Sequence, residues 1–357
     1  MRRLIFTFLL LVSSFTLFYG QSEADKRQAR IIGSDAMALI RVKSYEKSHK
    51  MLLMCSKLDP DNFLYPYEIG YIYMLQKKYN QAIEYFEKAA EKDSVTDLCF
   101  QMLGNSYYLA GKRDLSKDAY ARGLEKFPSS GRLYLGLGNA SHDDMIKALS
   151  YYEYGVKVDL SYALNYYWLA KIFCNTPERI WGLIYGEIFL NLEQDTRRSD
   201  EISSLLYDTY REGIVKNDSM TSVNFYRMAF TYKNENVTPT KILPISMIYD
   251  PCMKEAVKEV KEINLTSLDV VRSSFIRHYY QENYNISHPC ILFEWHKTLM
   301  DKGYFDCYNY WLLKKGDPTD FSIWYASNQD RYEAFLKWFS ENPLVLGPSR
   351  RFHRFAY

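Results

Sequence analysis

Small residues recur along this sequence at nearly constant spacing. Ala36, Gly70, Gly104 and Gly138 are 34 positions apart, and Ala170 follows 32 positions later. Small side chains let two helices approach closely, so this spacing predicts repeated pairs of antiparallel helices. Such pairs bury their apolar faces by stacking on their neighbours. The spacing therefore predicts an all-α solenoid, and it constrains the fold more than any other feature of the chain.

The residues around these marks follow a common pattern. In the clearest unit, between Phe63 and Lys92, a large–small pair is followed by aromatic and small residues: Ile69-Gly70, Tyr73, Tyr79, Ala82, Phe86 and Ala89. These residues resemble the signature of the tetratricopeptide repeat (TPR) family, and the next unit repeats it with Leu103-Gly104, Tyr107, Tyr120 and Pro128. The resemblance implies four to five TPR units over about residues 30–195, with an irregular turn at 141–144. It also implies binding of a protein or peptide partner.

The first twenty residues have the features of a secretory signal peptide. Arg2 and Arg3 precede an apolar run that is shorter than the roughly 20 residues of a spanning helix. We therefore expect residues 1–20 to be removed and the protein to be secreted or periplasmic, with no integral membrane segment left. The segment also accounts for the small excess of 45 Lys and Arg over 43 Asp and Glu, so we expect no nucleic-acid partner.

The repeat pattern ends near residue 215. Residues 216–264 contain Pro239, Pro244 and Pro251, which predict an irregular linker. Helices are then expected near 267–284, 290–302, 304–315, 318–327 and 330–341. We therefore expect a TPR domain over 21–215, the linker over 216–264, an α-helical C-terminal domain over 265–345 and a tail over 346–357.

The first helices of the repeats are expected to line a concave, partner-binding groove. The residues predicted to line it are Tyr67, Tyr71, Met74, Gln101, Asn105, Tyr108, Arg132, Asn139, Tyr167 and Lys171. One TPR subclass clamps a terminal carboxylate with Lys, Asn and Arg side chains. Only Asn105 and Arg132 match that pattern here, because Tyr67, Tyr71 and Gly136 replace its other members. We expect instead a peptide segment held by aromatic and amide side chains, and packing between repeats for about half of the tyrosines.

The C-terminal region is rich in aromatic residues. Trp295, Trp311, Trp324 and Trp338 fall at helical spacing with other apolar residues, which favours a packed aromatic core. The alternative is a platform that stacks on sugars, as in a glycan-binding envelope protein. A core would bury the indole rings, whereas a platform would expose them.

No enzyme motif is present in the sequence, so we expect neither catalysis nor a cofactor. His288, Cys290, Glu294 and His296 are the nearest approach to a metal cluster, but Glu294 and His296 do not share a helical face. Cys55 and Cys99 fall at core positions, while one disulfide among Cys252, Cys290 and Cys307 is compatible with export. The oligomeric state is left open. The predicted function is a secreted or periplasmic scaffold that binds a protein through its groove.

Overall fold

The computed structural model describes residues 2–216, 221–226 and 245–347. Side chains are described from Ser22 onward, except that of Ser246. The chain packs into two compact units, Met1–Ala140 and Ser141–Tyr357, and each is considered by itself. We refer to them as unit 1 and unit 2.

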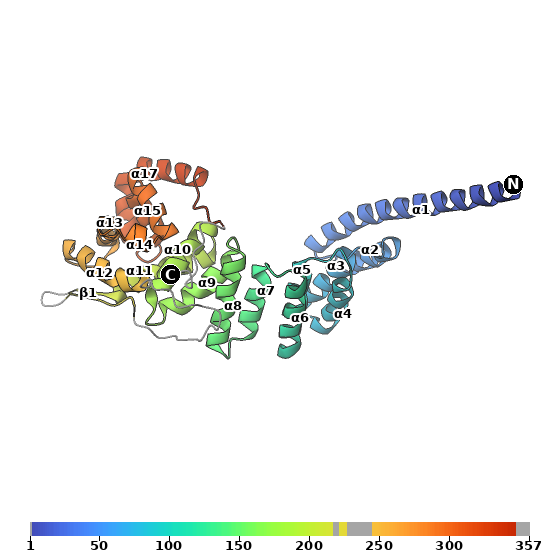
Figure 1. The fold of residues 1–357 in the computed structure, drawn as a ribbon, viewed down its shortest axis with the longest axis horizontal. Helices are drawn as coiled ribbons and strands as arrows, with labels where there is room; N and C mark the ends of the chain where they lie inside the picture. Colours follow the sequence, from blue (N-terminus) through green and yellow to red (C-terminus); the bar gives the residue numbers. More distant parts are fainter. Residues whose placement is uncertain (1, 217–220, 227–244, 348–357) are drawn as a thin grey trace. The chain divides into compact units, whose positions relative to one another are not determined.

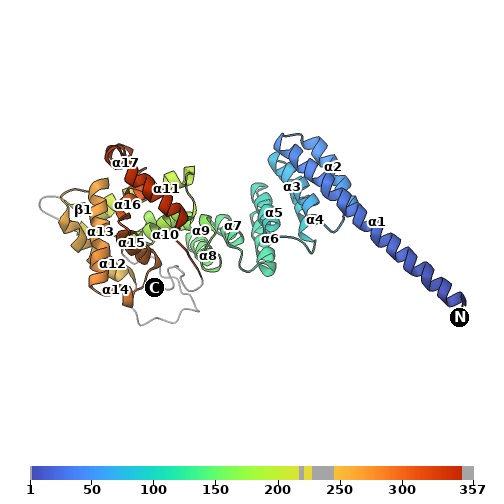
Figure 2. The ribbon, with the colours of Figure 1, turned by 90° about the horizontal axis from the view of Figure 1, so that it is seen from above.

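Unit 1 is a stack of antiparallel helix pairs (Figure 1). Its helices are α1 (Arg2–Arg41), α2 (Tyr45–Leu58), α3 (Leu64–Leu75), α4 (Tyr79–Ala90), α5 (Asp97–Leu109), α6 (Arg113–Lys126) and α7 (Gly131–Ala140). Helices α3 and α4 form one pair, α5 and α6 the next, and the two pairs lie side by side (Figure 2). The all-α solenoid expected from the sequence is confirmed.

The turns inside the pairs repeat with the same period as the small residues. Lys43, Lys77 and Gly111, again 34 positions apart, have positive φ angles of 60°, 58° and 76°. At each, the residue's amide bonds to a carbonyl three positions back, and the next amide bonds to one five positions back, which caps the first helix. The next position at this 34-residue spacing is Met145, which is not in a turn but begins α8 (Met145–Val158), with Asp144 as the N-cap. The irregular turn expected at 141–144 therefore coincides with the boundary between the two units.

Tyr120 explains why two of the small residues in unit 1 are glycines. A Cβ atom added to Gly104 would lie 2.3 Å from Tyr120 Cε1, and one added to Gly136 would lie 2.4 Å from the same atom. Real Cβ contacts are never so short, so the ring of Tyr120 occupies the space that side chains at both positions would need. The Tyr120 hydroxyl donates a hydrogen bond of 2.7 Å to Asn105 Oδ1. One aromatic ring thus joins α5, α6 and α7.

Unit 2 joins further repeat-like helices to the C-terminal helices. Its elements are α8 (Met145–Val158), α9 (Ala163–Cys174), α10 (Arg179–Leu192), α11 (Arg197–Gly213), β1 (Ile214–Lys216), β2 (Thr221–Val223), α12 (Ile245–Ala256), the 3-10 turn η1 (Val257–Glu259), α13 (Leu265–Gln281), α14 (Tyr284–Ser287), α15 (Ile291–Asp301), α16 (Phe305–Leu313) and α17 (Pro318–Glu341). Strands β1 and β2 form an antiparallel hairpin in which Ile214 pairs with Val223. The C-terminal region is helical, as expected, and the non-helical Asn328 divides α17 into two helical segments that agree with the helices expected at 318–327 and 330–341.

The division of the chain differs from the domains expected at 21–215 and 265–345. Helices α10 and α11 pack directly on the C-terminal helices, for example through Ser203 Oγ, which donates to the Leu312 carbonyl at 2.7 Å. The stretch 216–264 is also more regular than expected, because it contains the hairpin and α12. Pro251 lies inside α12, where burial of Ile248, Tyr249, Cys252 and Met253 offsets the lost backbone hydrogen bond.

Three expectations fall wholly or partly outside the described residues. Residues 2–20 of the expected signal segment belong to α1, but their side chains are not described; residue 1, residues 217–220 and 227–244 of the expected linker, and residues 348–357 of the tail are not described at all. Among the residues whose side chains are described, no helix is long and apolar enough to cross a bilayer.

All six cysteines are buried and free. Cys55 and Cys99 occupy core positions, as the sequence predicted; Cys55 Sγ also donates to the Ala29 carbonyl at 3.3 Å. The disulfide considered for Cys252, Cys290 and Cys307 does not form. Burial raises the pKa of Cys99, Cys174, Cys290 and Cys307 to about 12, which keeps these thiols protonated.

Candidate functional site

The residues predicted to line the groove divide between the two units. Eight belong to α3, α5 and α7 of unit 1, and Tyr167 and Lys171 belong to α9 of unit 2. Within unit 1, α3 contacts α5 and α5 contacts α7, so the three first helices are neighbours. The Ser106 hydroxyl donates to Met74 Sδ at 3.0 Å across the α3–α5 contact.

Several of the predicted residues in unit 1 hold the repeats together. Tyr67 is mostly buried, with its ring 5.5 Å from that of Phe86. Asn105 accepts the hydrogen bond from Tyr120, and Arg132 Nε lies 3.2 Å from Asp97 Oδ2. Tyr71, Met74 and Gln101 are half-buried, whereas Tyr108 and Asn139 are exposed. Some of these residues therefore serve packing between helices, whereas others are accessible to solvent.

Helical periodicity places a set of accessible side chains on one face of these three helices. Glu68, Tyr71 and Leu75 lie at i, i+3 and i+7 along α3, and the 34-residue spacing places Met102, Asn105 and Leu109 at the equivalent positions of α5 and Asn139 at that of Tyr71 on α7. Arg132 lies seven positions before Asn139 and so faces the same side of α7. We call this set the first-helix face: Glu68, Tyr71, Leu75, Met102, Asn105, Leu109, Arg132 and Asn139. Leu75 and Leu109 are 43% and 50% exposed, so the face has an apolar part as well as polar side chains.

The carboxylate clamp is excluded by the packing of Tyr120. The last basic residue of the clamp would stand at Gly136, and any side chain there would collide with the Tyr120 ring. Arg132, the remaining basic residue of the pattern, is paired with Asp97, which also accepts a 2.6 Å hydrogen bond from Ser130. The face therefore has no cluster of cations with which to hold a terminal carboxylate.

The two predicted residues of unit 2 are engaged by α11. Tyr167 is buried and its hydroxyl donates to Glu201 Oε2 at 2.7 Å, while Lys171 Nζ lies 2.5 Å from Glu201 Oε1. The Lys171 ammonium also lies over the ring of Trp168 at 5.4 Å. Since α11 supplies the partner of both side chains, they serve contacts within unit 2.

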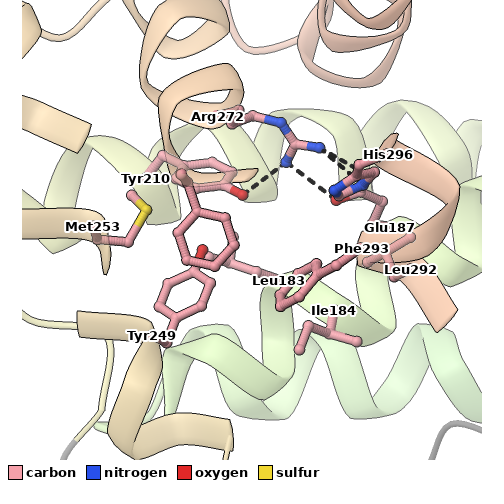
Figure 3. Close-up of a pocket in the computed structure, with 11 residues that line it drawn as sticks. Leu183, Ile184, Glu187, Tyr210, Tyr249, Met253, Arg272, Leu292, Phe293 and His296 are labelled. Carbon is pink, nitrogen blue, oxygen red and sulfur yellow. Dashed lines mark hydrogen bonds and ion pairs between the residues drawn. The ribbon is translucent and has the colours of Figure 1, made fainter. Parts of the chain in front are cut away.

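Unit 2 contains a second candidate, a buried ionic cluster (Figure 3). Arg272 on α13 binds both carboxylate oxygens of Glu187 on α10, with Nη2–Oε1 and Nη1–Oε2 distances of 2.7 and 3.1 Å. His296 on α15 places Nε2 2.5 Å from Glu187 Oε1. All three side chains are at least 95% buried. Burial alone would raise the pKa of Glu187, but Arg272 and His296 outweigh it and hold the pKa at about 2.

The remaining donors of Arg272 are also occupied. Its Nη1 donates to the Tyr210 hydroxyl at 2.7 Å and its Nε donates to Asn309 Oδ1 at 2.6 Å. Burial lowers the pKa of His296, so the ring is neutral at neutral pH and suited to donate from Nε2 to Glu187. The cluster therefore joins five helices through paired groups.

A cavity of about 20 Å³ borders this cluster, lined by Tyr210, Tyr249, Arg272 and His296 and by apolar residues such as Phe293. That volume holds about one water molecule. The polar groups around it pair with one another, so the arrangement fixes the positions of α10, α11, α13, α15 and α16.

Sequence reasoning did not find Glu187 or Arg272. The only local signal was a charged residue at an otherwise apolar position, Glu187 within the run of α10 that is buried from Ile180 to Leu190. From the sequence, His296 was considered only as part of a possible metal cluster with His288, Cys290 and Glu294. Within the described part of the chain, no three His, Cys, Asp or Glu residues are placed to hold a metal ion.

The C-terminal tryptophans form part of the packed core, as the sequence favoured. Trp295 and Trp311 are buried, and the ring of Trp295 stacks on Trp338 at 5.7 Å. Trp324 is half-buried and stacks on Tyr310 at 4.0 Å. Faces that are covered by other rings are not available to stack on sugars, which counts against the glycan-binding alternative.

Comparison with known proteins identifies the repeats. Models of the tetratricopeptide repeat match residues 67–94 and residues 99–130. These segments cover most of α3 with α4, and α5 with α6. None of the curated proteins compared with the sequence matches it.

Several solved structures are similar to this chain. PilF of Pseudomonas aeruginosa is 13% identical with a TM-score of 0.45, and the match covers 53% of this chain and 86% of PilF. YrrB, described as a TPR protein with an unusual peptide-binding site, is 20% identical with a TM-score of 0.36, covering 51% of this chain and 94% of YrrB. A form of MamA from Desulfovibrio magneticus RS-1 is 16% identical with a TM-score of 0.38, covering 47% of this chain and 97% of MamA.

These similarities are modest, and the assignment depends on the repeat matches and on the helix pairs they cover. The turns at Lys77 and Gly111 and the close approach of Tyr120 to Gly104 give those pairs their repeated geometry. This chain therefore contains tetratricopeptide repeats, which are matched at residues 67–94 and 99–130.

Proposed function

We propose that the chain is a secreted or periplasmic scaffold whose first-helix face binds an extended segment of a partner protein. The observation that carries the proposal is the accessible side of three neighbouring first helices within and beside the matched repeats. Leu75 and Leu109 of this face are 43% and 50% exposed, and Tyr108, next to Leu109 on α5, is 37% exposed, so apolar and aromatic surface is available for burial against a partner.

The binding part of the proposal is tested by peptide selection. The mature chain, residues 21–357, is used to select dodecapeptides from a phage-displayed library, and the affinity of the selected peptides is measured. Replacing Tyr71→Ala removes an aromatic contact from the face and is expected to weaken binding about tenfold. Tyr79→Ala, on the second helix of the same repeat, is the matched control and is expected to change nothing. Failure to enrich any peptide, or equal affinity for both variants, would refute the proposed binding face.

The location is tested separately. The full chain is expressed in a bacterial host and the N-terminus of the exported protein is determined by mass spectrometry. We expect it to begin near Gln21, and we expect Leu9→Arg, which interrupts the apolar run, to leave the protein uncut inside the cell. Full-length protein that remains inside the cell without this substitution would contradict export.

A further inference from the structure

Glu68 is a half-buried carboxylate without a partner. Among the contacts of the described residues it forms no ion pair and no side-chain hydrogen bond. Burial alone raises its pKa. Glu87, a similarly placed carboxylate on α4, instead binds Arg122 at 2.9 and 3.1 Å and accepts a 3.0 Å hydrogen bond from Tyr107. Leaving a partly buried charge unpaired is costly, so Glu68 is a position at which the fold gives up stability.

The three first helices of unit 1 carry a net charge of −1, which comes from Glu68. Helices α3, α5 and α7 contain only three ionisable residues with a formal charge, namely Glu68, Asp97 and Arg132. Asp97 and Arg132 pair with each other at 3.2 Å. The first-helix face is therefore anionic at one point, and its complement is a cation.

The neighbours of Glu68 suit an organic cation. Tyr71 lies one turn further along α3, and no partner of its hydroxyl group is found among the described residues. A tyrosine ring attracts Lys or Arg through its π face, and a carboxylate pairs with the same groups. The exposed Leu75 and Leu109 lie on the same face and provide apolar contact for the neighbouring residues of a segment.

We propose that Glu68 and Tyr71 form a subsite that selects a Lys or Arg side chain in the bound segment. This inference depends on the proposed function, because it specifies the chemistry of the segment that the first-helix face binds. A segment with a single acidic residue at that point is disfavoured by Glu68, and no unpaired cation on the three helices compensates for it.

The experiment uses the selected dodecapeptides and the mature chain. We expect the pool selected by the unmodified protein to be enriched in Lys or Arg at one position, and replacement of that residue by Met to weaken binding about tenfold. For Glu68→Gln the same replacement is expected to have no effect, and binding is expected to lose its sensitivity to salt. Glu84→Gln removes an exposed carboxylate from α4 and is expected to behave as the unmodified protein.

The melting temperature separates a loss of binding from a loss of folding. The melting temperature of Glu68→Gln is expected to equal or exceed that of the unmodified protein, because an unpaired charge is removed; a loss of binding then does not come from unfolding. Two outcomes would overturn this inference and leave the proposed function standing. The peptides could bind in a Tyr71-dependent way without any preference for Lys or Arg, or the preference for Lys or Arg could persist in Glu68→Gln. If no peptide is enriched, both are overturned.

Discussion

Replacing Glu187→Gln is expected to destabilise unit 2 by about 3 kcal/mol at neutral pH. The substitution keeps the shape of the side chain but leaves the buried Arg272 without its counter-ion. Glu187 has a pKa of about 2 in the folded protein against an ordinary value of 4.5. A lowering of that size corresponds to about 3 kcal/mol of stability, similar to the cost of breaking other buried ion pairs.

The pH dependence of this effect follows from the direction of the shift. Because the folded pKa is lowered, the unfolded chain binds more protons between the two pKa values. The contribution of the ion pair is therefore complete above about pH 4.5 and is lost as the pH falls towards 2. In acid, protonated Glu187 resembles glutamine, so the stability difference between the two proteins is expected to shrink.

Tryptophan fluorescence provides a selective assay. All six tryptophans lie in unit 2, so urea unfolding followed by this signal reports on that unit. The free energy of unfolding is compared between the two proteins at pH 7 and pH 3. Asp208→Asn removes an exposed carboxylate from α11 and is the matched control, expected to change little at either pH.

Two results would refute this reasoning. If Glu187→Gln unfolds at the same urea concentration as the unmodified protein at pH 7, the cluster does not stabilise unit 2. If the difference is as large at pH 3 as at pH 7, the effect comes from packing and not from the charge of Glu187.

Three other predictions concern the packing around Tyr120 and the burial of the thiols. Gly136→Ala places a Cβ atom 2.4 Å from the Tyr120 ring and is expected to destabilise unit 1 by about 1–3 kcal/mol in thermal unfolding followed by circular dichroism. Tyr120→Phe loses only the hydrogen bond to Asn105 and is expected to cost about 1 kcal/mol; a larger loss than for Gly136→Ala would contradict the steric argument. The six buried thiols are expected to react with a thiol reagent only after unfolding, and dithiothreitol is expected to leave the melting temperature unchanged. Rapid labelling of the native protein, or a lower melting temperature in dithiothreitol, would show that the thiols are accessible or paired.

Much of unit 1 was determined by local sequence. The spacing of Gly70 and Gly104 predicted paired helices because close approach of two helices depends on small residues at fixed turns of each. The first helices and their accessible positions followed from the same period, so residues such as Tyr71 and Asn105 could be assigned to one face. Glu68 was overlooked there because its lack of a partner becomes evident only when the neighbouring helices are in place.

The organisation of unit 2 was decided by tertiary structure. Glu187 and Arg272 are 85 positions apart in the sequence, and no local period relates them. Their pairing, and the contact of α10 and α11 with the C-terminal helices, replaced the separate domains and irregular linker expected from the sequence. A buried charge requires a partner of opposite charge, but the sequence does not specify from which helix that partner comes. The repeat was thus determined by the sequence itself, whereas the buried ion pair and the unpaired Glu68 depend on which distant residues the fold brings together.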